Sequence, residues 1–251
     1  MQVSSLSRDL AMALDPAELA RQTGLEPDPW QAKALRSDVP RILLNCSRQS
    51  GKSTIAGLIS VHTAIYQPGS LVLLLSPSLR QSGELFRKAH DTHAALTDPV
   101  AITAESALRL ELSNGSRIVS LPGKETTVRG YSGVRLLVVD EAARVSDELY
   151  YSVRPMLAVS NGRLIALSTP FGTRGWWYEA WKSDESWECY EIPASQCPRI
   201  TEKFLEEERR SMGEWWYAQE YECRFLDAET QPFGREDVDR AFTEEVESWD
   251  L

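Results

Sequence analysis

The residues Gly51, Lys52 and Ser53 stand where a short polar loop meets a helix-like segment, just after a short apolar run at 42–44. The backbone N–H groups of such a turn and the dipole of the following helix favour an anion. A lysine placed there can reach the β- and γ-phosphates of a nucleotide, and the next hydroxyl can ligate Mg²⁺. The candidate phosphate-binding loop comprises Ser47, Arg48, Gln49, Ser50, Gly51, Lys52, Ser53 and Thr54. Cys46 replaces the first glycine of the usual G-x-x-x-x-G-K-[ST] pattern, so this motif alone leaves a chance Gly-Lys-Ser turn open.

Two carboxylates further along the chain supply the other half of a candidate site. Asp140 and Glu141 follow a continuous apolar run at 136–139, which is typical of a strand buried in a parallel sheet. Such sheets bind ligands at the carboxyl ends of their strands. There Asp140 can hold Mg²⁺ and Glu141 can polarise an attacking water, although acidic residues are also common in a helix first turn. Together with the loop, this pair predicts a site for ATP and Mg²⁺.

The elements that must position these residues alternate along the chain. Apolar runs predict strands, and helical periodicity or capping signals predict helices between them. We expect strands at 41–45, 71–75, 135–139 and 163–168, helices at 6–23, 52–66, 80–96 and from about 146, and a hairpin of 108–112 with 117–121. This order predicts an α/β fold of the P-loop NTPase type (RecA or ASCE-like), with a mostly parallel sheet and helices on both faces.

The composition limits the classes of protein that this chain could be. No apolar run approaches the ~20 residues of a membrane span, and the four cysteines form no CxxC pair that would indicate a zinc site. The net charge of the 251 residues is −10. Residues 201–251 hold 6 Lys and Arg against 16 Asp and Glu, which accounts for all of it. The rest of the chain is neutral, so a DNA-tracking face is neither indicated nor excluded.

The pattern changes near residue 176, and we therefore predict two parts. Residues 1–175 form the ATPase core with a helical N-terminal segment on the adenine side, and residues 176–251 form a lid or linker subdomain. The second part opens with a cluster of tryptophans at positions 176, 177, 181 and 187. These rings either stack on DNA bases or pack the subdomain against the sheet, which is the more common role for tryptophan.

Four segments together resemble the ATPase domain of the large terminase subunit, the motor that packages DNA into tailed-phage and herpesvirus capsids. Pro29-Trp30-Gln31 is similar to the adenine motif of that family, and the resemblance implies that Gln31 binds the base edge with Trp30 nearby. The phosphate loop lacks its first glycine and carries Arg48, as terminases commonly do. The other two segments are 127–131, which contains Arg129, and Ser168-Thr169-Pro170, which looks like the coupling motif. The likeness covers nearly the whole chain.

This resemblance implies partners as well as a reaction. It implies ATP hydrolysis that drives double-stranded DNA into a procapsid. The motor would be a homo-oligomeric ring on the portal, would act with the small terminase subunit, and would work in the host cytoplasm. Arg48 in cis or Arg129 in trans would act as the arginine finger. Family members typically continue into a nuclease, so this chain is either an excised ATPase domain or a protein that acts with a separate nuclease. Residues 228–251 resemble a linker or an edge, and the interrupted pattern at 244–251 favours excision. No nuclease activity is expected of this chain.

Two other functions stay open at this point. A superfamily-two helicase also pairs a glutamine motif with Asp-Glu-Ala, but it needs a second RecA-like lobe for which 251 residues leave no room. A non-catalytic, nucleotide-dependent assembly module would bind ATP without hydrolysing it. The intact pair Asp140 and Glu141 argues against that alternative.

Overall fold

The computed structural model describes residues 5–123, 128, 130–183 and 186–227. Its centre is a sheet of eight strands. They are β1 (Arg41–Cys46), β2 (Leu71–Ser76), β3 (Ile102–Ser106), β4 (Arg109–Leu112), β5 (Arg117–Pro122), β6 (Val134–Asp140), β7 (Arg163–Ser168) and β8 (Glu188–Ile192). The strand order is β3-β4-β5-β2-β6-β7-β1-β8. Strands β5, β2, β6, β7, β1 and β8 are parallel, whereas β3 and β4 form an antiparallel edge.

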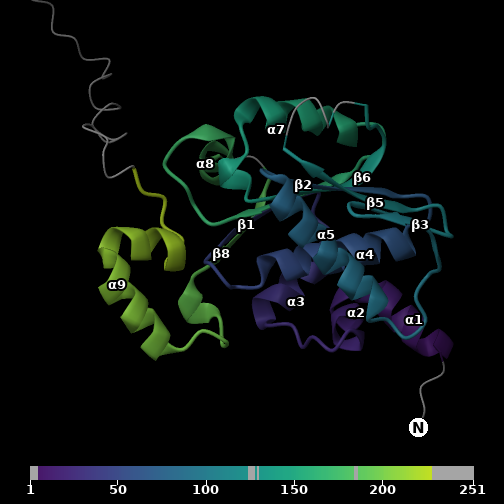
Figure 1. Cartoon of the computed structure of the whole chain (residues 1–251), viewed down its shortest axis with the longest axis horizontal. Helices are drawn as coiled ribbons and strands as arrows, with labels where there is room; N and C mark the ends of the chain where they lie inside the picture. The colour runs from purple at the N-terminus through teal and green to yellow at the C-terminus, as the bar shows by residue number, and fades with distance from the viewer. Residues whose placement is uncertain (1–4, 124–127, 129, 184–185, 228–251) are drawn as a thin grey trace, which may run out of the picture.

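Helices connect these strands. They are α1 (Ser5–Leu14), α2 (Pro16–Gln22), α3 (Pro29–Arg36), α4 (Lys52–Tyr66), α5 (Leu79–Ala94), α7 (Asp147–Val153), α8 (Gly175–Lys182) and α9 (Glu202–Tyr221), with short 3₁₀ turns η1 (Ala142–Arg144), η2 (Arg154–Leu157) and η3 (Ala194–Gln196). Figure 1 shows α7 and α8 above the sheet and α3, α4 and α5 below it. None of the described helices is long and apolar enough to cross a membrane.

Alternate residues of each buried strand serve the two helical layers. In β1, Leu44 belongs to the core shared with α3, α4 and α5, whereas Leu43 belongs to the core shared with α7 and α8. Both leucines are fully buried. A strand covered on both faces is apolar at nearly every central position, which explains the near-continuous apolar runs in the sequence. The fold therefore confirms the predicted α/β class.

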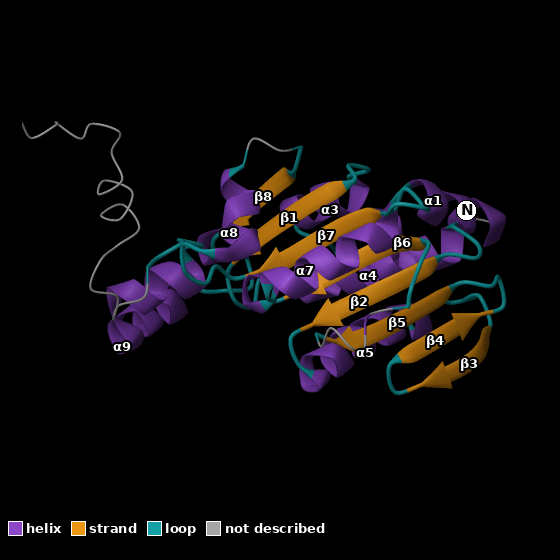
Figure 2. Ribbon diagram, turned by 90° about the horizontal axis from the view of Figure 1, so that it is seen from above, coloured by secondary structure: helices purple, strands orange, loops and turns teal. Residues whose placement is uncertain are grey.

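One feature of the strand order positions the site: β7 lies between β1 and β6. Asn45 in β1 pairs with Ser168 in β7, and Leu167 pairs with Asp140 in β6. The carboxyl ends of the three strands are therefore level. In Figure 2 the arrowheads of the parallel strands point to the end of the sheet where α9 lies.

Some elements differ from the sequence prediction. Strand β3 and strand β8 were not predicted, and both lie at sheet edges. All five residues of β3 are exposed, so its sequence carries no apolar signal. The predicted helix at 6–23 is divided into α1 and α2, because Asp15 caps α2 through a hydrogen bond from the Ala17 N–H at 2.9 Å.

The tryptophans after β7 pack inside the molecule. Trp176 and Trp177 are 3% and 2% exposed, and they lie in the core with α7. The Trp176 ring stacks on Tyr150 at 3.8 Å between centroids, and its Nε1–H donates to the Val145 carbonyl at 3.0 Å. These two rings therefore have the packing role rather than the DNA-stacking role.

The segment that follows β8 builds a small apolar cluster of its own. Ala194, Leu205, Tyr217 and Tyr221 form it, between η3 and the two halves of α9, which bends at Gly213. Strand β8, however, pairs with β1 in the main sheet. The division at residue 175 stays a prediction. The predicted linker at 228–251 and Arg129 lie outside the described residues.

Candidate functional site

The phosphate-binding loop connects β1 to α4. Cys46 is the last residue of β1 and is fully buried, so the position that usually carries glycine belongs here to the strand. Burial raises the pKa of its thiol to about 12. Gly51 has φ of 91°, a left-handed conformation that favours glycine, and α4 begins at the next residue. The first N–H groups of α4 have no intrahelical acceptor, so this end of the helix can bind an anion.

Lys52 and Glu141 meet across the end of β7. The side chain of Lys52 is largely buried, and its Nζ lies 3.9 Å from Glu141 Oε1. Glu141 has a φ of 50°, which is unusual for a residue with a side chain. Backbone strain of this kind gathers at functional sites. The turn directs Glu141 toward the lysine instead of continuing the line of β6.

Asp140 is the second carboxylate of the site. It is 7% exposed, and its Oδ2 lies 3.5 Å from Ser53 Oγ. Burial, followed by the negative charge of Glu141, raises the pKa of Asp140 to about 6, although Lys52 opposes this rise. A hydroxyl and a carboxylate that face each other offer the oxygen ligands that Mg²⁺ prefers. A cation would also compensate the cost of burying the Asp140 charge. These two residues therefore fit a magnesium ion.

The candidate coupling motif at the end of β7 contacts the turn that follows β6. Ser168 is fully buried at the end of β7, and its Oγ accepts a hydrogen bond from the Ala143 N–H at 3.2 Å. Thr169 and Pro170 follow it and are buried as well. The candidate coupling motif is thereby joined to the turn that carries Glu141. This contact offers a physical route from the site to the segment that begins α8.

Arg48 is tied to α9 instead of pointing freely into the loop. Its guanidinium pairs with Glu220, and its backbone N–H donates to the Glu220 carbonyl at 3.0 Å. This carboxylate raises the pKa of Arg48. The Arg48 side chain is 59% exposed, whereas that of Glu220 is only 10% exposed. The end of α9 is therefore packed directly against the phosphate loop.

The adenine motif lies at the start of α3. Trp30 is 8% exposed and packs in the core below the sheet. Gln31 is 1% exposed, and its amide already has protein partners. Its Oε1 accepts from the Asp28 N–H at 2.9 Å, and its Nε2 donates to the Ser50 carbonyl at 3.3 Å. Gln31 joins α3 to the phosphate loop, and a base contact by Gln31 stays a prediction.

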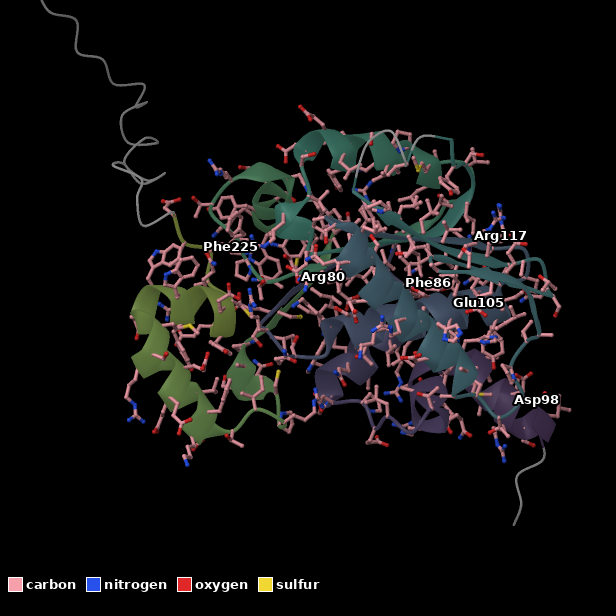
Figure 3. All side chains as sticks on the ribbon, viewed as in Figure 1. Arg80, Phe86, Asp98, Glu105, Arg117 and Phe225 are labelled. Carbon is pink, nitrogen blue, oxygen red and sulfur yellow. The ribbon has the colours of Figure 1, made fainter. Side chains whose placement is uncertain are left out.

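The site opens into a cleft of about 500 Å³. The loop residues and Glu141 line it, together with three cations that the sequence analysis missed, namely Arg80, Lys88 and Arg144. Arg80 lies at the start of α5, at the end of the sheet nearest α9 (Figure 3). With Arg48 and Lys52, five cations face one carboxylate, Glu141, in this lining. A cleft of this charge suits a polyphosphate.

A sequence signal for Arg80 and Arg144 was present. Arg80 follows β2 closely, and Arg144 follows Glu141 by three positions, so both come just after parallel strands. Arg80 and Arg144 line the same cleft because β2 is the neighbour of β6 in the sheet, and the sequence does not give this strand order. The Arg144 guanidinium lies over the Phe171 ring at 4.2 Å, one residue beyond the coupling motif.

Solved structures of large terminases share this fold. The ATPase domain of the Thermus phage P74-26 large terminase aligns with a TM-score of 0.74 and 20% identity, over 82% of this chain and 97% of that one. The large terminase of another thermophilic bacteriophage, in complex with ADP, aligns with a TM-score of 0.64 and 13% identity, over 83% of this chain and 53% of that one.

Sequence comparison agrees with the shared fold. The terminase large subunit of Thermus phage G20c is 27% identical over an alignment of 175 residues, and the match covers 62% of this chain and 36% of that protein. The Thermus virus P23-45 large subunit matches equally well. This chain thus spans about a third of the length of these relatives. Residues 43–240 match the family described as the N-terminal part of the terminase large subunit of T4likevirus type. The chain belongs to this terminase family.

Proposed function

We propose that this chain is the ATPase motor domain of a phage large terminase, which hydrolyses ATP to move double-stranded DNA into a procapsid. The observation that carries this proposal is the meeting of Lys52, Ser53 and Glu141 in one basic cleft, with Asp140 beside Ser53. These residues come from two strand ends that lie on either side of β7. The family match favours a terminase over a helicase or an assembly module.

Each residue of the cleft has a proposed part in the reaction. Lys52 binds the β- and γ-phosphates, while Ser53 and Asp140 hold Mg²⁺. When bound, Mg²⁺ supplies positive charge to the phosphate oxygens. Glu141, beside Lys52, orients and polarises the water that attacks the γ-phosphate. Phosphoryl transfer depends mainly on positioning and fixed positive charge, which the basic lining of the cleft supplies.

Further parts of the proposal concern the base, the arginine finger and coupling. Trp30 and Gln31 lie on the adenine side, and Arg48 or Arg129 acts as the arginine finger, the latter from a neighbouring subunit. Ser168, Thr169 and Pro170 transmit the loss of the γ-phosphate, a role that the Ser168 contact with Ala143 supports. The motor is proposed to act as a ring on the portal, with the small terminase subunit, in the host cytoplasm.

The test of this function is ATP turnover by the purified chain and by Glu141→Gln. We expect the parent to hydrolyse ATP and the variant to bind it but to lose at least about 10²-fold in kcat, which is typical for removal of a positioned base. Appreciable residual turnover in the variant would remove Glu141 from this role. The chain is not expected to cut DNA, because no acidic cluster with nuclease spacing is evident in the sequence after residue 230. Nuclease activity in the purified chain would contradict that expectation.

A further inference from the structure

Arg199 connects the segment after β8 with the far side of the phosphate loop. It lies between η3 and α9, and its guanidinium holds both oxygens of Asp28, at 3.0 Å and 2.8 Å. The same Nη2 also donates to the Ser50 carbonyl at 3.2 Å. The Asp28 side chain is only 9% exposed, whereas that of Arg199 is 48% exposed. A bidentate pair with a largely buried carboxylate fixes the plane of the guanidinium.

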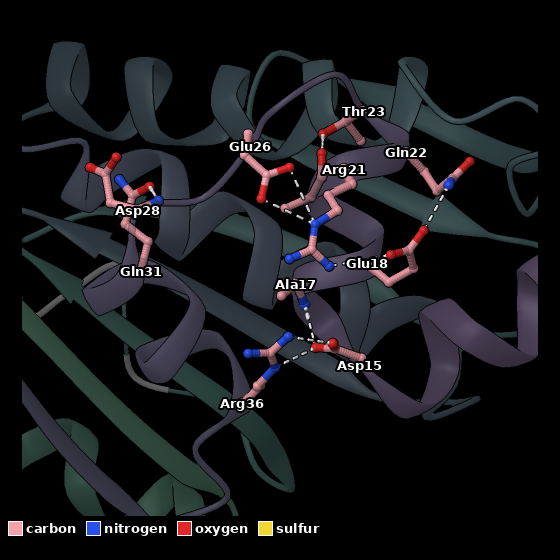
Figure 4. Close-up of polar contacts among 11 residues, drawn as sticks. Asp15, Ala17, Glu18, Arg21, Gln22, Thr23, Glu26, Asp28, Gln31 and Arg36 are labelled. Atoms are coloured by element: carbon pink, nitrogen blue, oxygen red, sulfur yellow. Dashed lines mark hydrogen bonds and ion pairs between the residues drawn. The ribbon is translucent and has the colours of Figure 1, made fainter. Parts of the chain in front are cut away.

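The Ser50 carbonyl has a second donor, which comes from α3. Gln31 Nε2 donates to it at 3.3 Å. Gln31 Oε1 in turn accepts from the Asp28 N–H at 2.9 Å, a contact that Figure 4 shows. Asp28 thus anchors both donors, Arg199 through its carboxylate and Gln31 through its backbone. A carbonyl oxygen has two lone pairs, so these two donors satisfy its full capacity. The orientation of this carbonyl is set by both neighbours.

The direction of the Ser50 carbonyl determines the direction of the next N–H. No described peptide bond is cis, and in a planar trans peptide the C=O and the following N–H point in opposite directions. The Gly51 N–H therefore points away from Arg199 and Gln31. Gly51 is one of the residues that line the cleft. In a phosphate-binding loop, such N–H groups hold the α- and β-phosphates.

Both side chains also pack closely over Gly51. A Cβ at this position would lie 2.7 Å from Gln31 Nε2 and 3.5 Å from Arg199 Nη2. The loop is therefore contacted by two side chains that are not among the residues lining the cleft. None of the motifs that identified the site includes Arg199.

We propose that Arg199, held by Asp28, is a positioning residue that aims the Gly51 N–H at the nucleotide phosphates. This inference rests on the proposed function and deepens it, because it makes the segment after β8 part of nucleotide binding. It predicts weaker binding of ADP as well as ATP, since both carry the β-phosphate that this N–H faces. The effect should be larger on KM than on kcat, because the lost contact serves ground state and transition state alike.

An ion pair that only stabilises the packing of this segment would behave differently. Removing it would lower the melting temperature and leave the ADP affinity of the folded protein unchanged. Arg209 in α9 is a matched control, because it pairs with Glu214 and Glu222 at a distance from the loop. Arg209→Met also removes ion pairs of this segment, and it leaves both donors to the Ser50 carbonyl in place.

The experiment is calorimetric titration of MgADP into the parent, Arg199→Met and Arg209→Met, with a melting curve for each. We expect Arg199→Met to raise the ADP dissociation constant about tenfold, the effect of one lost hydrogen bond to a charged group, and Arg209→Met to leave it unchanged. Arg199→Lys and Asp28→Asn should weaken binding in the same direction, and they decide the question if Arg199→Met does not fold.

Dissociation constants within twofold of the parent in these Arg199 and Asp28 variants would overturn the inference while leaving the proposed function intact. A parent chain with no affinity for MgADP would instead contradict the proposed function and this inference together.

Discussion

The ammonium group of Lys52 lies 3.9 Å from the Glu141 carboxylate, although the two residues follow strands that are not neighbours. Lys52 begins the helix after β1, and Glu141 follows β6, with β7 between them. The lysine is therefore placed to bind phosphate and to fix the candidate base at the same time. Substitutions at the two positions should not be additive, because loss of the lysine also releases Glu141.

The Arg48 guanidinium pairs with Glu220, so it can stabilise the transition state in cis only if it also lies close to the bound γ-phosphate. We expect Arg48→Ala to lower kcat by about 10²-fold, the usual cost of removing one donor to the transition state, with a smaller change in ADP affinity. Arg224, which pairs with Glu222 in the same segment, is the control. If Arg48→Ala hydrolyses ATP like Arg224→Ala, its role in cis is wrong.

Arg129 is the candidate for action in trans. We expect Arg129→Ala subunits and Glu141→Gln subunits to be inactive separately. Mixed under assembling conditions, they should recover activity, because an intact Glu141 site can meet an intact Arg129 of its neighbour. Steady-state ATP turnover across mixing ratios measures this recovery. A mixture as inactive as its components would count against a role in trans.

Gly51 should tolerate no side chain, for two separable reasons. Its φ of 91° strains any L-residue, and an added Cβ would meet Gln31 Nε2 at 2.7 Å. Gly69 has a similar φ of 74° but nothing within 4 Å of an added Cβ. We expect Gly69→Ala to lose about 1 kcal/mol of stability in urea denaturation and Gly51→Ala to lose more, because of the added contact with Gln31. Only Gly51→Ala should also lose ADP affinity, and equal affinities in the two variants would contradict the account of the loop.

His93 should make the protein less stable below neutral pH. It is 2% exposed and its Nε2 lies 2.9 Å from the Val100 carbonyl. Burial lowers its pKa from the ordinary value of 6.5. Below that value the unfolded chain binds the proton more readily than the folded one, so the free energy of unfolding falls as pH falls.

The test compares urea denaturation of the parent and of His93→Gln between pH 7.5 and 5.5. The raised pKa of Asp140 acts in the opposite direction near pH 6, and it cancels in this difference because both proteins retain it. We expect the parent to lose more stability than the variant on acidification. Equal losses would show that His93 does not carry this dependence.

Much of the fold followed from local pattern. The strands β1, β2, β6 and β7 lie within one residue of their predicted bounds, because buried parallel strands form near-continuous apolar runs. The helix α4 has the predicted bounds. The loop and the carboxylate pair were predicted because their chemistry depends on short motifs.

The contacts between distant segments could not be predicted in the same way. Which strand separates β1 from β6 depends on crossovers that leave no local trace in the sequence. The pairing of Arg48 with Glu220, and that of Asp28 with Arg199, joins positions 172 and 171 apart. Single charged residues at such separations look like ordinary surface charges until the fold brings them together.

The most direct test of the whole account is magnesium-dependent nucleotide binding at Lys52. Glu141→Gln provides a chain that should hold ATP without hydrolysing it, and calorimetry can follow ATP binding with and without Mg²⁺. We predict affinity that requires Mg²⁺ and that falls by at least about tenfold when Lys52→Ala is added, since one charged contact to phosphate is lost. Absence of affinity in the first chain, or affinity unchanged by the second substitution, would contradict the claim that this loop binds ATP.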